Sequence, residues 1–258
     1  MKLNKIVIVW LMLIGILFGD QLTTISANKV LKAGVKADFE PFGFLDSNNQ
    51  LVGFDVDIAK FIAKELGVSI ELVPVTSANR IEMLLNNNVD IVAASMTHKK
   101  TRDKDIDFSI SYYFDGQGIL AKNSSTANSY NDFQGKKIGT LAGSVSGKVF
   151  EAISPLAKIS YYDTADLLLA AFEKGEIDAI TSDSTFLSEK AKKSNGKYKL
   201  IGKPFTIEPY AIGMKENESD LRDEINFAIQ KMVKSGYYDE IYLKWFGQKV
   251  VIKPELWP

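Results

Sequence analysis

Three polar side chains follow a short apolar segment in the first half of the chain and have the chemistry to hold a small carboxylate. Residues 89–94 suit a buried parallel strand, and Ser95, Thr97 and Arg102 come soon after it. In an open α/β sheet, ligands bind beyond the carboxyl ends of the strands, and a guanidinium pairs bidentately with a carboxylate. The stretch therefore predicts a carboxylate site. A charged, solvated loop in which Arg102 pairs with a neighbouring aspartate fits the same residues.

The elements around these residues alternate in the order of an α/β domain. The pattern "helix, turn, x-Asp, apolar strand, polar loop" occurs twice, at NNNVDIVAAS and at KGEIDAITSD. This repetition predicts two lobes of similar build. Strands are expected at 30–36, 51–54, 68–75, 89–94, 136–141, 158–161, 177–181 and 209–214. Helices are expected from Asp55, from Ser77, and at 145–153, 163–174, 221–234 and 238–246.

Composition excludes several classes of function. The 258 residues are 46% hydrophobic and 24% charged, which is typical of a globular protein. The net charge of -1 offers no basic surface for nucleic acid. The chain has no cysteine and one histidine, which excludes a disulfide framework and a Cys/His metal site. We therefore expect no metal and no cofactor.

The N-terminus has the composition of a secretory signal peptide. Lys2 and Lys5 form a positive region, residues 6–18 are apolar, and the polar segment that follows ends at Ala27. Cleavage after Ala27 is predicted, so residues 1–27 would not belong to the fold. A single membrane anchor is the alternative, although the apolar run is short for a span. Without a cysteine, no lipoprotein anchor is expected, and the product should be a soluble, periplasmic monomer.

Six segments follow one another along the chain: GVKADFEPFGF, LVGFDVDIAKFIAKELG, SANRIEMLLNNNVDIVAASMTHKKTRDKDIDFS, FQGKKIGTLAGS, GEIDAITSD and KWFG. In this order they resemble the periplasmic amino-acid-binding proteins of bacterial ABC importers, the family 3 solute-binding proteins of the polar amino acid type. The resemblance implies the two-lobe, type II periplasmic binding protein fold, an α/β fold with a doubly wound sheet in each lobe and two hinge crossovers. Lobe 1 would comprise residues 28–119 and 209–258, and lobe 2 residues 120–208.

The resemblance assigns the α-carboxylate of an amino acid to the loop described first. Arg102, with Thr97 and Ser95, matches the positions that hold this carboxylate in the family. Ser144 matches a second-lobe loop that offers backbone N–H groups to the same carboxylate, at the start of a helix whose N-terminus favours an anion. Ser144 as an ordinary helix N-cap remains the structural alternative.

Two further positions complete the family's amino-acid site. Asp183 matches the carboxylate that pairs with the α-ammonium group, and Phe39 matches the aromatic residue that covers the ligand. The structural alternatives are a helix cap for Asp183 and a core residue for Phe39.

Three residues point to the side chain of the ligand. Lys36 and Arg80 resemble positions used by acidic-amino-acid binders of the family, and Tyr210 matches an aromatic hydroxyl in the same pocket. The alternatives are that Lys36 is a solvated surface lysine and that Arg80 pairs on the surface with Glu82 or Asp38. Asp38 and Glu40 would neutralise part of the positive charge of the cleft if they pointed into it. The cations favour glutamate or aspartate and disfavour a basic ligand, which would be an unpaired cation in a closed cleft. A neutral polar or sulfur amino acid (glutamine, asparagine or cysteine) remains the alternative.

The implied mechanism is hinge closure around the ligand and delivery to the permease of an ABC transporter in the inner membrane. Two rival functions use the same fold. A periplasmic dehydratase or lyase would need a general acid or base, for which Glu82, Glu208 and His98 are the candidates. A sensor or receptor domain would need a transmembrane segment or an output domain after the two lobes. Because both α-groups of an amino acid already have partners, we expect a binding protein that has no catalytic residue and is not an enzyme.

Overall fold

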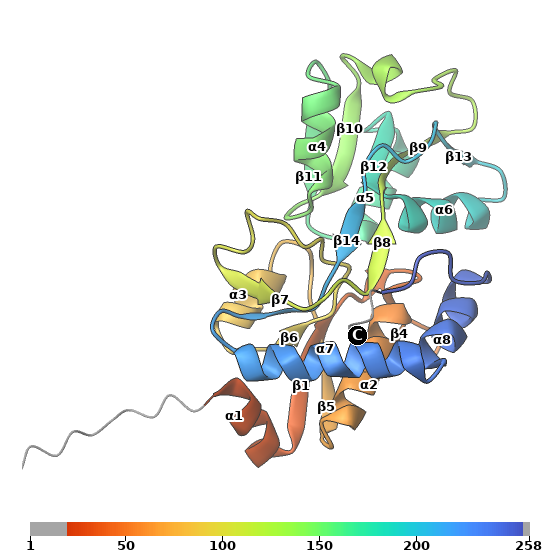
Figure 1. Cartoon of the computed structure of the whole chain (residues 1–258). Helices are drawn as coiled ribbons and strands as arrows, with labels where there is room; N and C mark the ends of the chain where they lie inside the picture. The colour runs from red at the N-terminus through yellow and green to blue at the C-terminus, as the bar shows by residue number, and fades with distance from the viewer. Residues whose placement is uncertain (1–19, 255–258) are drawn as a thin grey trace, which may run out of the picture.

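Two lobes, each built on a five-stranded mixed sheet, make up residues 20–254, the part of the chain that this computed structural model describes (Figure 1). The apolar part of the predicted signal peptide lies outside the described residues. Within them, no helix is both long enough and apolar enough to cross a membrane.

The sheet of lobe 1 has four strands that run in one direction and one strand, β15, that runs in the opposite direction. β1 lies between β5 and β6 and runs parallel to both, while β15 runs antiparallel to β6 and β7. In spatial order the strands are β5 (Ser69–Pro74), β1 (Val30–Val35), β6 (Ile91–Val92), β15 (Gly213–Lys215) and β7 (Ile106–Phe108). The helices of this lobe are α1 (Gln21–Asn28), α2 (Phe54–Glu65), α3 (Arg80–Leu85), α7 (Ser219–Lys234) and α8 (Tyr237–Phe246).

Lobe 2 repeats this plan, as the duplicated sequence pattern predicts. β10 runs parallel to β11 and β12, and β9 runs antiparallel to β12 and β13. In spatial order the strands are β11 (Lys158–Tyr162), β10 (Lys137–Leu141), β12 (Ala179–Asp183), β9 (Gln117–Lys122) and β13 (Tyr198–Leu200). The helices are α4 (Ser146–Ile153), α5 (Ala165–Lys174), α6 (Ser184–Lys193) and the short 3-10 helix η1 (Tyr130–Phe133).

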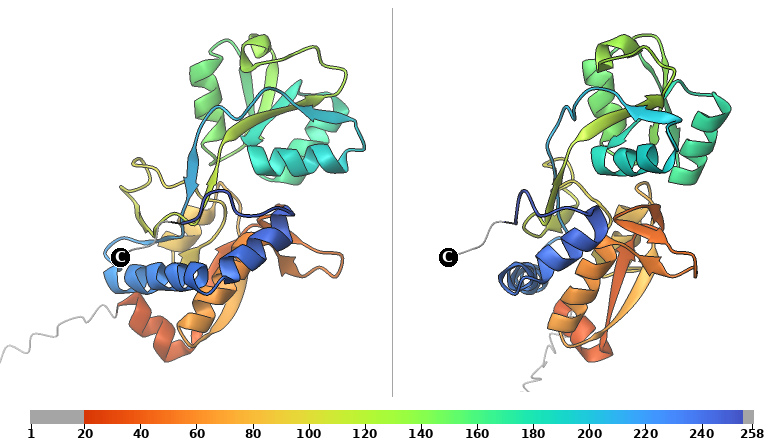
Figure 2. Two further views of the ribbon diagram at one scale, coloured as in Figure 1. Left: turned by 45° about the vertical axis from the view of Figure 1, so that its right-hand side comes forward. Right: turned by 90° about the vertical axis from the view of Figure 1, so that its right-hand side faces the viewer.

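Two adjacent strands connect the lobes. β8 (Tyr113–Asp115) pairs antiparallel with β14 (Glu208–Tyr210), and the further views show the lobes joined through this ribbon (Figure 2). A three-stranded sheet, β2 (Asp38–Phe39), β3 (Gly43–Leu45) and β4 (Leu51–Val52), belongs to lobe 1. The architecture thus has the two lobes and two crossovers that the sequence predicts. The residue boundaries given for the lobes stay a prediction.

Several predicted elements differ in detail. The single strand expected at 209–214 is two strands, β14 in the hinge and β15 in the sheet of lobe 1. The helix expected from Ser77 begins at Arg80, because Thr76 and Asn79 hydrogen bond to each other in a turn before it. Asp55 does not cap α2, since Gly53 occupies the N-cap position.

The expectation that residues 1–27 lie outside the fold is wrong for residues 20–27. Asp20 caps α1 by accepting a hydrogen bond from the Leu22 amide, and Ile25 is buried in the core of lobe 1. Gln21 Nε2 donates to Asp90 Oδ1 at 2.6 Å. The polar segment that resembles the end of a signal peptide is therefore a capped helix with one apolar residue turned into the core. Where the chain is cleaved remains a prediction.

Candidate ligand-binding site

A small cavity lies between the two lobes and brings most of the predicted site residues together. It opens beyond the carboxyl ends of β1 and β6 in lobe 1 and of β10 and β12 in lobe 2. Its volume is about 10 Å³, close to that of one water molecule, so an amino acid enters only when the lobes move apart. Seven of the nine predicted residues line it: Lys36, Phe39, Arg80, Ser95, Thr97, Ser144 and Asp183. The lining residues that the sequence did not indicate are Ser77, Leu141, Val145 and Ser182.

Ser95 is held in place by a buried carboxylate that was not predicted to belong to the site. Its amide and hydroxyl donate to Asp55 Oδ2 at 2.7 and 2.9 Å, and the Tyr112 hydroxyl donates to Asp55 Oδ1 at 2.8 Å. The backbone of Ser95 is left-handed, with φ of 49°, a conformation that non-glycine residues adopt rarely. Burial raises the pKa of Asp55, while the three hydrogen bonds oppose that shift. Asp55 therefore fixes the position of a lining hydroxyl from behind the cavity.

Two buried cations form one side of the cavity. Lys36 Nζ lies 3.8 Å from the centroid of the Phe39 ring, and Arg80 Nη1 donates to the carbonyl of Ala94. Burial, and then the charge of Arg80, lower the pKa of Lys36 to about 8. Burial, and then the charge of Arg102, lower the pKa of Arg80 to about 9. Among the described residues neither cation has a carboxylate within ion-pair distance, so each would gain from an acceptor in the cavity.

Asp183 faces the cavity from lobe 2, at the end of β12. It occupies the N-cap position of α6, but its side chain makes no capping hydrogen bond, which argues against a purely structural cap. Its Oδ1 accepts a hydrogen bond of 2.5 Å from Gln117 Nε2. Tyr210 does not line the cavity. Its hydroxyl donates to Asp115 Oδ2 at 3.4 Å, and burial together with Asp183 and Asp115 raises the pKa of Tyr210 well above its usual value.

Arg102 lies beside the cavity and joins the two lobes. Nη1 donates to the Thr97 carbonyl at 2.8 Å, and Nη2 donates to the Gly143 carbonyl of lobe 2 at 3.0 Å. The solvated-loop alternative, in which Arg102 pairs with a neighbouring aspartate, is not what the described residues show, because Asp103 pairs with His98 at 2.9 Å. The guanidinium therefore holds one backbone carbonyl of each lobe in this arrangement.

Ser144 lies in the loop between β10 and α4. Its hydroxyl donates to the Leu141 carbonyl at 2.7 Å, and α4 begins at Ser146 with Val145 as its N-cap. Ser144 is therefore not the N-cap of this helix. The preceding Gly143 has φ of 71° and touches lobe 1, where a Cβ at this position would lie 2.3 Å from the Ser77 carbonyl oxygen.

Three consecutive residues of lobe 1 hold lobe 2 at the mouth of the cavity; we call Asp38, Phe39 and Glu40 the β2 clasp. Asp38 Oδ2 accepts a hydrogen bond of 2.7 Å from the Ala165 amide at the start of α5. Phe39 stacks on Phe186 of α6 with centroids 4.2 Å apart. Glu40 pairs with Lys193 at 2.5 Å. Both clasp carboxylates thus have partners in lobe 2 rather than in the cavity.

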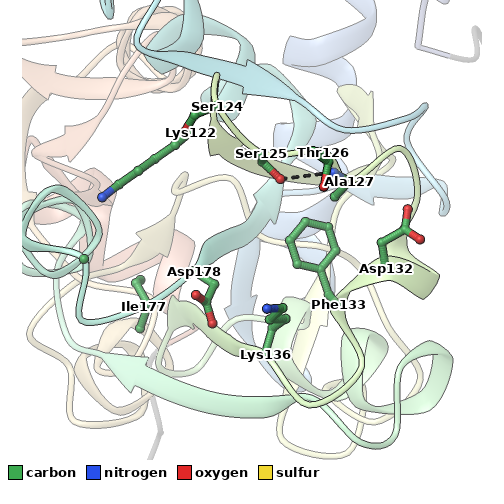
Figure 3. A pocket seen from close by; sticks show the side chains of 11 residues that line it. Lys122, Ser124, Ser125, Thr126, Ala127, Asp132, Phe133, Lys136, Ile177 and Asp178 are labelled. Carbon is green, nitrogen blue, oxygen red and sulfur yellow. Dashed lines mark hydrogen bonds between the residues drawn. The ribbon is translucent and has the colours of Figure 1, made fainter.

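A larger hollow, of about 460 Å³, lies on lobe 2 and contains none of the predicted site residues (Figure 3). Lys122, Lys136 and Asp178 line it, and most of its residues are exposed. Lys136 and Asp178 precede β10 and β12, so this hollow lies at the amino ends of those strands. The small cavity lies at the carboxyl ends, where α/β sheets bind ligands, and is therefore the candidate site.

Comparisons with known proteins agree with this architecture. Residues 31–248 match the family model described as bacterial extracellular solute-binding proteins, family 3. The chain is 38% identical over 234 residues to the ABC transporter glutamine-binding protein GlnH of Bacillus subtilis (strain 168), which covers 89% of this chain and 85% of that protein. It is 35% identical over 188 residues to a glutamine-binding protein of Geobacillus stearothermophilus, with 71% of each chain covered.

A solved structure is similar over nearly its whole length. An ancestral arginine-binding protein bound to glutamine superimposes with a TM-score of 0.82 and 37% identity, covering 85% of this chain and 99% of the other. These matches confirm the type II two-lobe fold that the sequence motifs predict. The chain belongs to the bacterial extracellular solute-binding proteins, family 3.

Proposed function

We propose that this protein captures L-glutamine outside the cytoplasm and delivers it to the permease of an ABC transporter. The observation that carries the proposal is the cavity itself, where Asp183 of lobe 2 faces Lys36, Arg80 and three hydroxyl groups of lobe 1. The similarity to two glutamine-binding proteins and to a structure bound to glutamine supports the choice of ligand. The family is one of solute-binding proteins, which accords with capture rather than catalysis.

The polar groups suit the two ends of a zwitterion. Arg102, with Ser95 and Thr97, would hold the α-carboxylate, and Asp183 would hold the α-ammonium group. The side chain would then lie toward Lys36 and Arg80, whose N–H groups only donate hydrogen bonds. A glutamine carbonyl oxygen would add an acceptor beside these donors, of which Arg80 Nε has no partner among the described residues, whereas a lysine or arginine ligand would add a third cation.

L-Glutamate is the second candidate, and the buried cations favour it. With Lys36, Arg80 and Arg102 protonated and Asp55 and Asp183 ionised, three positive charges stand against two negative ones. In the β2 clasp, Glu40 pairs with Lys193 of lobe 2, whereas Asp38 accepts only a neutral amide there and its charge raises the pKa of Lys36, so Asp38 offsets part of this excess. An anionic side chain would still lie next to Lys36 and Arg80, two buried cations that line the cavity. This is the basis of the acidic preference expected from the sequence.

Closure follows from the division of these groups between the lobes. Ser95, Thr97 and Arg102 belong to lobe 1 and would meet the ligand first. Asp183 reaches it only when β8 and β14 bend and bring lobe 2 across. The ligand makes both sets of contacts only in the closed form, so binding shifts the population toward closure. The closed protein is the form that a permease would recognise.

The test is a calorimetric titration of protein that has been unfolded and refolded to remove any ligand retained during purification. We expect L-glutamine to bind, and Asp183→Ala and Arg102→Ala each to weaken binding by at least tenfold, which is typical of hydrogen bonds to charged groups. Arg222→Ala is the matched control, because Arg222 pairs with Asp107 on the surface of lobe 1. Tight binding of glutamate alone would select the second candidate, and binding of no amino acid would refute the proposal.

A further inference from the structure

Gln117 is a buried side chain next to Asp183 that none of the sequence motifs indicated. It is the first residue of β9, and its side chain is fully buried. In the antiparallel pairing of β9 with β12, Gln117 lies directly opposite Asp183. Opposed residues of an antiparallel pair project from the same face of the sheet, so the carboxamide lies on the face from which Asp183 reaches the cavity.

The two polar atoms of this carboxamide have different surroundings. Nε2 donates to Asp183 Oδ1 at 2.5 Å, which orients the carboxylate. Oε1 is buried and, among the residues that the structure describes, has no hydrogen-bond partner. Buried acceptors are nearly always paired, so an unpaired one on a side chain that bonds to a cavity-lining residue calls for a donor. Exchanging the two atoms would turn Oε1 toward the Asp183 carboxylate and put two acceptors together.

The α-ammonium group that we assign to this cavity brings three N–H donors. The two oxygens of Asp183 can face at most two of these donors, and one of them already accepts from Gln117, so at least one N–H needs another acceptor. Because Oε1 and Nε2 share one carbon atom, Oε1 lies beside the carboxylate that would face the ammonium. We propose that Gln117 is a further specificity-determining residue: its Nε2 positions Asp183, and its Oε1 accepts a second hydrogen bond from the α-ammonium group. This inference rests on the proposed capture of an amino acid.

The experiment compares two ligands in three proteins. L-Glutamine is titrated against its 2-hydroxy analogue, which keeps the carboxylate and the side chain but replaces the ammonium with a hydroxyl. The proteins are the wild type, Gln117→Met, which keeps the volume without the polar atoms, and Thr181→Val. Thr181 is the matched control, since its buried hydroxyl donates to the Gly118 carbonyl in the same sheet and not to Asp183.

We expect Gln117→Met to weaken L-glutamine binding by roughly tenfold or more and to leave the 2-hydroxy analogue nearly unchanged, so that the preference for the ammonium ligand shrinks. Thr181→Val should leave that preference intact. The inference is wrong if Gln117→Met binds L-glutamine as the wild type does, or if it loses both ligands equally.

If wild type and Thr181→Val bind no amino acid, the proposed function fails and this inference fails with it. Melting curves show whether each variant is folded. If Gln117→Met does not fold, Gln117→Asn, which draws the carboxamide back by one methylene, is held to the same comparison of ligands.

Discussion

Lys36 and Arg80 bring two positive charges into a cavity from which water is nearly excluded. Burial opposes the charged form of both side chains, and the two cations also repel each other. Because an anionic ligand would stabilise the protonated form of Lys36, its binding and the protonation of this lysine should be linked. A neutral ligand lacks the charge that creates this link.

The first prediction concerns this linkage. The pKa of Lys36 is about 8 in the closed protein, and a bound glutamate would raise it. Glutamate binding then takes up a proton above pH 8, so its affinity should fall as the pH rises from 8 to 9.5. The affinity for glutamine should change much less. Calorimetry at three pH values measures both, and Lys36→Met should remove the difference in slope. Parallel profiles for the two ligands in the wild type would contradict the role of Lys36.

Asp55 and Asp57 allow a second comparison, between neighbouring carboxylates of one helix. Asp55→Asn would leave the Ser95 and Tyr112 donors poorly paired, at a cost of about 1–3 kcal/mol in the free energy of unfolding, and would release Ser95 from its left-handed conformation. Asp57 instead bonds to Lys244 and Trp245 of α8. We expect both Asp55→Asn and Asp57→Asn to melt at lower temperature than the wild type, but only Asp55→Asn to lose ligand affinity. If Asp55→Asn bound the ligand as tightly as the wild type does, Ser95 would need no support from Asp55.

At the scale of elements, helices with a clear apolar period were predictable, whereas two others were not. α2 and α7 place apolar side chains at helical spacing and lie close to the predicted limits. α6 was missed because its sequence, STFLSEKAKK, buries only Phe186 and Leu187. α1 was assigned to the signal peptide because its polar residues resemble the end of a leader. Its place in the fold depends on Asp90 and Glu218, which are distant in sequence.

The third prediction follows from α1. A chain that starts at Asp20 keeps the helix, whereas one that starts at Asn28 loses it together with Ile25. Full burial of an isoleucine is worth roughly 1.5–3 kcal/mol, and the bonds of Gln21 add to that. We expect the shorter chain to melt several degrees lower, at roughly 2–4 °C per kcal/mol. The intact mass of the exported protein should include residues 20–27. A mass that begins at Asn28, with equal melting temperatures, would show that α1 is dispensable.

For the whole molecule, the β2 clasp bears on the balance between open and closed forms. Its three contacts cross from lobe 1 to lobe 2, and the two polar ones are made by Asp38 and Glu40, which do not line the cavity. They therefore stabilise closure itself, and a change in this stability alters the apparent affinity for any ligand.

The fourth prediction removes the polar part of the clasp. Asp38→Ala combined with Glu40→Ala should increase the radius of gyration measured by small-angle scattering without ligand, and should weaken binding of all amino acids by the same factor. Glu65→Ala is the control, because Glu65 pairs with Lys231 within lobe 1. A loss of affinity for one amino acid only would mean that the clasp residues contact the ligand.

The site was predictable to the extent that its residues lie in short motifs. Ser95, Thr97 and Asp183 follow strands that end at the cavity, and resemblance to a family indicated their roles. Asp55 and Gln117 were not predictable in this way, because their partners are 40 and 66 residues away in sequence. Such pairs are brought together only by the register of strands and the packing of helices.

Gly143 of lobe 2 lies against lobe 1, with a backbone conformation that side chains rarely adopt and with the Ser77 carbonyl in front of it. One added methyl group at this position, as in Gly143→Ala, would prevent the lobes from closing completely. This variant would keep every group with which lobe 1 contacts an amino acid and would lose the contacts from lobe 2. The binding free energy of this variant would measure what lobe 1 alone contributes. The difference from the wild-type binding free energy would measure what closure contributes.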